Sequence, residues 1–134
     1  MKFIETIHLP NGLELTIHDL SRRIANDTVK VEVSFRMKVK VLESFFASPD
    51  DHLQLTRVFG DELTYEHKME RTFVYDAEEA STRADLLETF KNNSLHYLSS
   101  PNFAQKMALS LLRDIKQNPF KYRAATPSTA EQEE

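Results

Sequence analysis

The chain is 134 residues long with 40% hydrophobic and 28% charged residues, which fits one globular domain and excludes the disordered and membrane-spanning classes. It contains no cysteine, so disulfides, thiol nucleophiles and cysteine-ligated zinc are excluded, which is compatible with the cytoplasmic location that we expect. The formal net charge of −4 favours neither a nucleic-acid nor a membrane partner, because three acidic residues lie among the last four.

Two short alternating stretches, residues 3–9 and 13–17, predict a β-hairpin. Pro10-Asn11-Gly12 suits its loop, because these residues fit a type I turn followed by a left-handed residue. This loop sets the following pairs: Leu9 with Leu13, Ile7 with Leu15, Thr6 with Thr16, and His8 with Glu14.

A connector over residues 19–27 ends in the turn signal Asn26-Asp27 and leads to the longest alternating stretch, residues 28–41. Successive side chains of a strand point to opposite faces, so this stretch predicts one long β-strand with an apolar and a polar face. The apolar positions are Val29, Val31, Val33, Phe35, Met37, Val39 and Val41.

A short helix is predicted after this strand. Ser48 suits its N-cap, Pro49 its first position, and Gly60 the left-handed residue that ends it.

A second long strand then covers residues 62–75. Its odd positions form the more apolar face and are Leu63, Tyr65, His67, Met69, Arg71, Phe73 and Tyr75.

The two long strands are predicted to pair antiparallel, because the polar face of the first is mostly basic and that of the second mostly acidic.

Asp76 and Glu79 have capping-box spacing and open a helix to about Leu98. Ser100-Pro101 starts another helix, which ends at Asn118-Pro119. Both helices are amphipathic and need a common apolar surface, which the sheet provides.

The predicted fold is α+β. It has a mostly antiparallel four-stranded sheet, two C-terminal helices packed on one face, and a short helix between the third and fourth strands. Residues 1–123 form one domain in this prediction. Residues 124–134 lack apolar periodicity and are predicted to be a disordered acidic tail.

The first third of the chain carries a pattern of hairpin and loop residues: Asn11-Gly12-Leu13-Glu14-Leu15-Thr16-Ile17, Asp19, Ser21-Arg22, Ile24-Ala25-Asn26-Asp27 and Val29. This pattern resembles the opening of a small group of uncharacterised bacterial single-domain proteins. The resemblance implies a bacterial origin, and it carries over no functional residue.

No cofactor or metal site is predicted. The five histidines show no HxxxH or HExxH spacing, and His8 is expected to make a surface contact with Glu14. Gly12 and Gly60 are the only glycines and both serve turns, so no phosphate-binding glycine loop can form. No nucleophile motif such as GxSxG is present.

Tyr65, His67 and Arg71 share the apolar face of the second long strand, where two polar residues are unexpected. In one interpretation they line a ligand pocket between sheet and helices. In the other, no helix covers this end of the sheet and the side chains are solvated.

Asp19, Arg22 and Arg23 lie together in the connector. Paired arginines can bind a carboxylate or phosphate of a ligand or partner, but an Asp–Arg contact that ties a loop to itself is the alternative. The basic row on the first long strand does not indicate nucleic acid, because acidic residues of the second long strand are its expected neighbours.

The leading functional hypothesis is a non-enzymatic module that binds another protein or itself. No catalytic or cofactor motif is present, and the edges of long strands can pair between chains. The alternative is a small-ligand-binding protein or enzyme that uses the pocket at Tyr65, His67 and Arg71.

Overall fold

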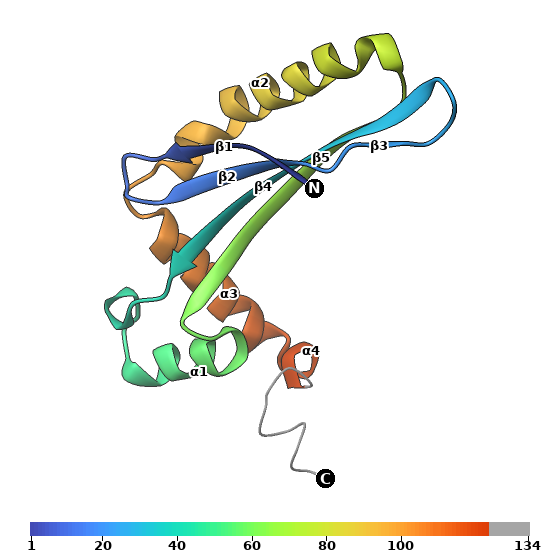
Figure 1. Ribbon diagram of the computed structural model, residues 1–134. Helices are drawn as coiled ribbons and strands as arrows, with labels where there is room; N and C mark the ends of the chain where they lie inside the picture. The colour runs from blue at the N-terminus through green and yellow to red at the C-terminus, as the bar shows by residue number, and fades with distance from the viewer. Residues whose placement is uncertain (124–134) are drawn as a thin grey trace. The chain divides into compact units, whose positions relative to one another are not determined.

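The computed structural model describes residues 1–123, so the tail predicted for residues 124–134 lies outside the described residues. Figure 1 shows an α+β protein with an open antiparallel sheet. The strands are β1 (Lys2–His8), β2 (Glu14–Asp19), β3 (Arg22–Arg23), β4 (Thr28–Lys40) and β5 (Glu62–Tyr75). The α-helices are α1 (Pro49–Phe59), α2 (Glu79–Leu98), α3 (Phe103–Gln117) and α4 (Pro119–Arg123), and 3-10 helices cover Glu43–Phe45 and Asp76–Glu78.

The described chain divides into two compact units, and each contains parts of both long strands. The first unit combines residues 1–38 with 64–101, and the second combines residues 39–63 with the chain from residue 102 onward.

The predicted hairpin is confirmed in its register. Strands β1 and β2 pair antiparallel with Thr6 opposite Thr16, Ile7 opposite Leu15 and His8 opposite Glu14. The backbone N–H of Leu9 donates to the carbonyl of Leu13 at 2.8 Å, and Gly12 closes the turn with a φ of 91°. A bulge between Phe3 and Glu5 places Phe3 opposite His18.

The connector predicted over residues 19–27 contains a short strand, so the sheet has five strands rather than four. Strand β3 continues the register of β2 along β4, with Ile17 opposite Phe35 and Arg22 opposite Lys30. Between the two strands, the N–H of Leu20 still donates to the carbonyl of Glu32 at 2.8 Å. Strands β2 and β3 therefore act as one interrupted partner of β4.

Strand β5 also pairs with β4, and side-chain contacts show that it runs antiparallel to it. Lys38 Nζ lies 3.2 Å from Thr64 Oγ1, and further along Lys30 Nζ lies 3.1 Å from Glu70. All predicted apolar positions of β4 and the residue that follows it are buried: Val29, Val31, Val33, Phe35, Met37, Val39 and Val41.

The side-chain alternation of β5 changes at Phe73, whose φ is 55°. The left-handed residue moves the alternation by one step, so Val74 is buried while Phe73 is 78% and Tyr75 60% exposed. The predicted apolar face of this strand is therefore wrong at Phe73 and Tyr75. Alternation could not reveal this change, because phenylalanine has no preference for positive φ.

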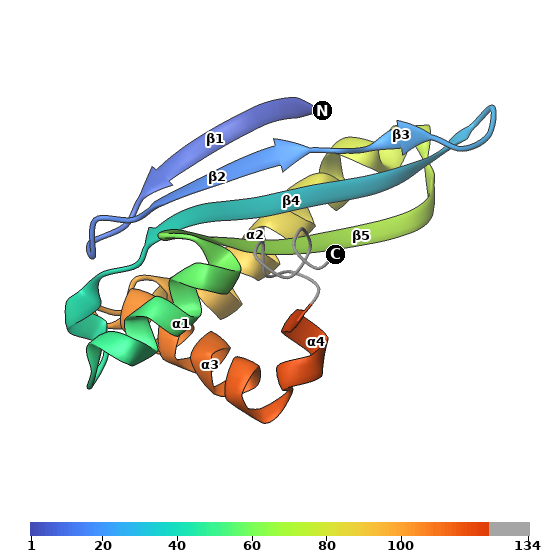
Figure 2. The ribbon, with the colours of Figure 1, turned by 90° about the horizontal axis from the view of Figure 1, so that it is seen from below.

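Helix α2 packs on one face of the sheet in the first unit, as predicted (Figure 2). The ring of Phe90 stacks on that of Phe35 with 3.7 Å between centroids. The predicted capping box does not form, because Asp76 lies in a 3-10 turn and pairs with Arg23.

The second unit is built around α1 and α3, which pack against each other. The Ser48 hydroxyl accepts from the N–H of Asp51 at 3.3 Å, and Gly60 ends α1 with a φ of 81°, both as predicted. The prediction that both C-terminal helices share the sheet face needs correction, because α3 contacts α1 and the 3-10 helix Glu43–Phe45 in this unit. Helix α4, directly after α3, was not predicted.

Candidate functional site

The predicted pocket residues Tyr65, His67 and Arg71 all lie on β5, on the α2 side of the sheet. Tyr65 is half-buried, and burial raises the pKa of its hydroxyl. His67 is exposed, although its ring lies over that of Phe90 at 5.8 Å, and Arg71 is exposed as well. His67 and Arg71 therefore lie at the surface of the strand, and Tyr65 lies partly beneath it.

Two ion pairs join α2 to the sheet. Lys91 of α2 pairs with Glu5 of β1 at 2.8 Å, and Arg83 of α2 pairs with Asp19 of β2 at 3.1 Å. Both contacts lie on the strands farthest from β5. Phe90 of the same helix also reaches β5, where its ring lies 5.8 Å from that of His67.

The predicted anion-binding residues each have a partner within the chain. Arg22 lies 3.8 Å from Glu32, and Arg23 lies 3.0 Å from Asp76. The hydrogen bond and charge of Asp76 raise the pKa of Arg23. These contacts tie the β2–β3 connector to β4 and to the start of α2.

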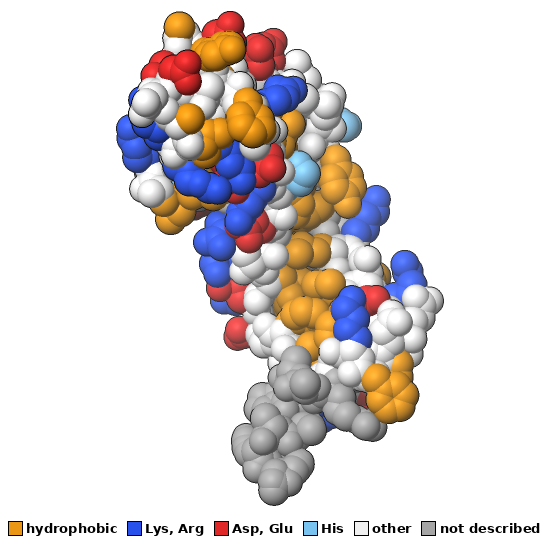
Figure 3. Space-filling model, turned by 90° about the vertical axis from the view of Figure 1, so that its right-hand side faces the viewer, with side chains coloured by type: hydrophobic (Ala, Val, Ile, Leu, Met, Phe, Trp, Pro, Cys, Tyr) orange, Lys and Arg blue, Asp and Glu red, His pale blue; other side chains and the backbone are white. Residues whose placement is uncertain are grey.

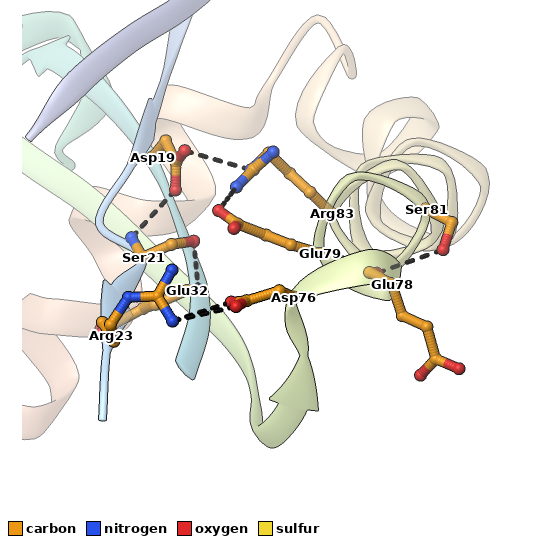
Figure 4. A network of polar contacts seen from close by, with 9 residues as sticks. All are labelled: Asp19, Ser21, Arg23, Glu32, Asp76, Glu78, Glu79, Ser81 and Arg83. Atoms are coloured by element: carbon orange, nitrogen blue, oxygen red, sulfur yellow. Dashed lines mark hydrogen bonds and ion pairs between the residues drawn. The ribbon is translucent and has the colours of Figure 1, made fainter. Parts of the chain in front are cut away.

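Asp19 lies at the centre of a polar network (Figure 4). It accepts a hydrogen bond from the N–H of Ser21 at 2.9 Å and pairs with Arg83, which also contacts Glu79. Partial burial acts to raise the pKa of Asp19, but the hydrogen bonds from Ser21 and the charge of Arg83 outweigh it, so the pKa lies below its ordinary value. The network joins β2 to the first turns of α2.

A shallow hollow of about 420 Å³ lies on the opposite face of the sheet from α2. Its lining includes Gly12, Leu13, Glu14, Thr16, His18, Arg36, Met37, Lys38 and Thr64. Arg36 pairs with Glu66 at 3.2 Å, and among residues 1–123 Lys38 has no carboxylate within ion-pair distance. The hollow offers polar and cationic groups to a small molecule. It was not predicted, because it joins the hairpin loop to β4 and β5.

Among the described strands, β5 has one hydrogen-bonded neighbour, β4, so no described strand pairs with its other edge. Phe73 and Tyr75 at its end are exposed, and Tyr97 at the end of α2 is 57% exposed. Hydrophobic side chains also reach the surface among charged ones in the view of Figure 3. We call residues 64–75 of this strand the β5 edge.

Comparisons of the chain with protein-family models, curated proteins and solved structures found no match. Within residues 1–123, no helix has both the length and the apolar composition needed to cross a bilayer. In the same residues, no three His, Asp or Glu side chains gather closely enough to hold a metal ion. The function is therefore inferred from the geometry of the chain's own residues.

Proposed function

We propose that this protein is a non-enzymatic protein-interaction module and that a strand of its partner docks on the β5 edge. The observation that carries the proposal is that β5 is 14 residues long and pairs on one side with β4, with no second neighbour among the described strands. The open side of an edge strand presents N–H and C=O groups, which a partner strand satisfies by extending the sheet.

The side chains around this edge have the composition of a binding surface. Tyr65 and Met69 are half-buried on the α2 side, and Phe73, Tyr75 and Tyr97 are largely exposed. Aromatic residues and methionine are enriched in protein interfaces, where they contribute large contact areas at low entropic cost. The backbone groups supply affinity in this mode, and these side chains supply selectivity.

The other candidate residues support this function less well. Asp19, Arg22 and Arg23 are each engaged in ion pairs with the chain's own residues, so binding an external anion would break those pairs. His67 and Arg71 lie in the open on β5, where they would contribute to a protein surface more readily than to a ligand cavity.

The test compares matched lysine substitutions on the two edge strands. Met69→Lys places a charge on the β5 edge, and Thr6→Lys places one on β1, whose one described neighbour is β2. Both residues are half-buried, so both variants are first checked for unchanged folding by circular dichroism. Self-association and binding of proteins from the source cells are then measured by sedimentation and affinity capture.

Loss of association in Met69→Lys, with retention in Thr6→Lys, is the expected result. A wild-type protein that stays monomeric and retains no protein would overturn the proposal, and so would association that both variants retain equally.

A further inference from the structure

We infer that the partner strand is the β5 edge of a second copy of this chain, paired antiparallel about a two-fold axis through Met69. The inference rests on the proposed function and adds the partner and the register. It follows from the positions of the charges and of the left-handed residue along β5.

The geometry of antiparallel pairing limits the possible registers. Residues directly opposite each other in an antiparallel pair lie on the same face of the sheet. When both copies keep their α2 faces on one side, an even-numbered residue of this strand can only face another even-numbered one. The two-fold axis must therefore pass through a residue.

Phe73 limits the length of the symmetric segment. Its left-handed backbone ends the regular alternation, so the straight part of the β5 edge stops at Thr72. A segment from Glu66 to Thr72 is centred on Met69. Pairing about Met69 thus uses the strand up to the bend without crossing it.

The charges on the open face favour this centre. Pairing about Met69 places Lys68 of each copy opposite Glu70 of the other, so two ion pairs form across the axis. The Lys68 and Glu70 side chains are 51% and 52% exposed, which leaves both accessible. On the other face, Met69 meets Met69, and His67 lies opposite Arg71.

Neighbouring centres fit the charges less well. An axis through Lys68 places that lysine opposite itself and Glu66 opposite Glu70. An axis through Glu66 or Glu70 places a glutamate opposite itself. Like charges directly opposite each other destabilise a strand pair.

An axis through His67 gives Glu66–Lys68 pairs, in which Glu66 also bonds to Arg36 at 3.2 Å, just as Glu70 also pairs with Lys30 at 3.1 Å in the Met69 register. The two centres therefore differ in the residues farther along the strand. The axis through His67 sets Arg71 opposite Leu63, which is buried in the second unit and 2% exposed. Pairing about His67 therefore forms fewer new contacts between the two copies than pairing about Met69 does.

The first experiment exchanges the charges of the predicted pair. In Lys68→Glu, glutamate faces glutamate at both pairs of the homodimer, and in Glu70→Lys, lysine faces lysine. Each variant alone is expected to raise the dissociation constant at least about tenfold. An equimolar mixture restores both attractive pairs in a heterodimer, so sedimentation of the mixture should return to the wild-type dimer fraction.

Lys38→Glu is the matched control, because it reverses a charge on the same face but on β4, away from the edge. Its dimer fraction should match that of the wild type. Glu70→Lys also removes the ion pair with Lys30, so its folding is checked by circular dichroism.

The second experiment uses single cysteines in a chain that has none of its own. Met69→Cys faces its symmetry mate and should form an intermolecular disulfide under mild oxidation. His67→Cys faces Arg71 in this register and should stay reduced. Efficient crosslinking of His67→Cys without that of Met69→Cys would overturn the register.

The outcomes separate this inference from the proposed function. A short strand pair is expected to have a dissociation constant of about 1 μM. A wild-type protein that stays monomeric at concentrations about 100-fold or more above this value overturns self-pairing. If that monomer still binds another protein in a way that Met69→Lys abolishes, the interaction function stands while the second copy is excluded. If the mixture of charge variants fails to restore the dimer while wild type dimerises, the register is wrong.

Discussion

The ring of Phe90 on α2 lies parallel to that of Phe35 on β4, with 9° between the planes and 3.7 Å between centroids. Both side chains are almost fully buried, at 1% and 0% exposure. Phe90→Ala leaves a cavity under the helix, so we expect it to lower the free energy of unfolding by about 3–5 kcal/mol. Urea denaturation measures this loss. Leu53→Ala on α1, where the leucine is 53% exposed, should change stability by less than about 1 kcal/mol.

Asn11 joins the first hairpin to the end of α2. Its side-chain amide donates to the carbonyls of Leu98 at 2.9 Å and Ser100 at 2.8 Å. Asn11→Ala leaves both carbonyls without this donor and should lower the free energy of unfolding by about 1–3 kcal/mol. Asn93→Ala, at an exposed position of the same helix, is the control and should raise stability slightly, because alanine favours helix. Equal effects of the two variants in urea denaturation would contradict this role.

Phe73 holds a left-handed backbone that a side chain disfavours and that glycine adopts freely. Its side chain is 78% exposed, so its removal forfeits little burial. We expect Phe73→Gly to raise the free energy of unfolding by about 0.5–1 kcal/mol. Tyr75→Gly, in extended backbone on the same strand, should lower it by a similar amount. Thermal denaturation of both variants gives the comparison, and a destabilised Phe73→Gly would mean that its ring contributes more than its exposure indicates.

Asp19 makes stability depend on acid pH. Its pKa in the folded chain lies below the ordinary value of 3.8, so the stability it contributes is present above that pH. This contribution is lost as pH falls through the lowered pKa, because protonation weakens the contacts with Ser21 and Arg83. Asp19→Asn should lower the free energy of unfolding by about 1–3 kcal/mol at pH 7. The difference from wild type should shrink below about pH 3.8.

Denaturation at a series of pH values tests this dependence. Asp85→Asn, an exposed substitution on α2, is the control and should stay within about 0.5 kcal/mol of wild type at pH 7. A gap between Asp19→Asn and wild type that stays constant down to pH 2 would assign the loss to packing and not to charge.

Local patterns predicted much of the fold. The alternation over residues 28–41 gave the central strand, and Pro10-Asn11-Gly12 gave a hairpin register that the structure confirms. Both depend on neighbours in the sequence or on one turn. The bonds from Asn11 to Leu98 and Ser100 could not be predicted, because they join residues 87 and 89 positions apart.

The features that the sequence did not predict also depend on contacts between residues that are distant in the sequence. Strand β3 is two residues long, so no alternation marks it, and only its register with β4 makes it a strand. Helix α3 has a clear apolar face, but its sequence cannot say whether that face meets the sheet or α1. The residues predicted for a pocket lie on β5 as expected, whereas alternation along one strand cannot predict how far each of them is exposed.

The contact between Lys38 and Thr64 gives a way to isolate the first unit. These residues end its two long-strand segments and face each other across the strand pair, with Lys38 Nζ 3.2 Å from Thr64 Oγ1. An Asn-Gly turn suits a two-residue connection between facing strand residues, so it can replace residues 39–63. A chain shortened in this way and ended at Pro101 retains β1 to β3, β4 up to Lys38, β5 from Thr64, α2 and the Phe35–Phe90 stack. Such a miniature would carry the β5 edge on a continuous polypeptide small enough for complete assignment by NMR.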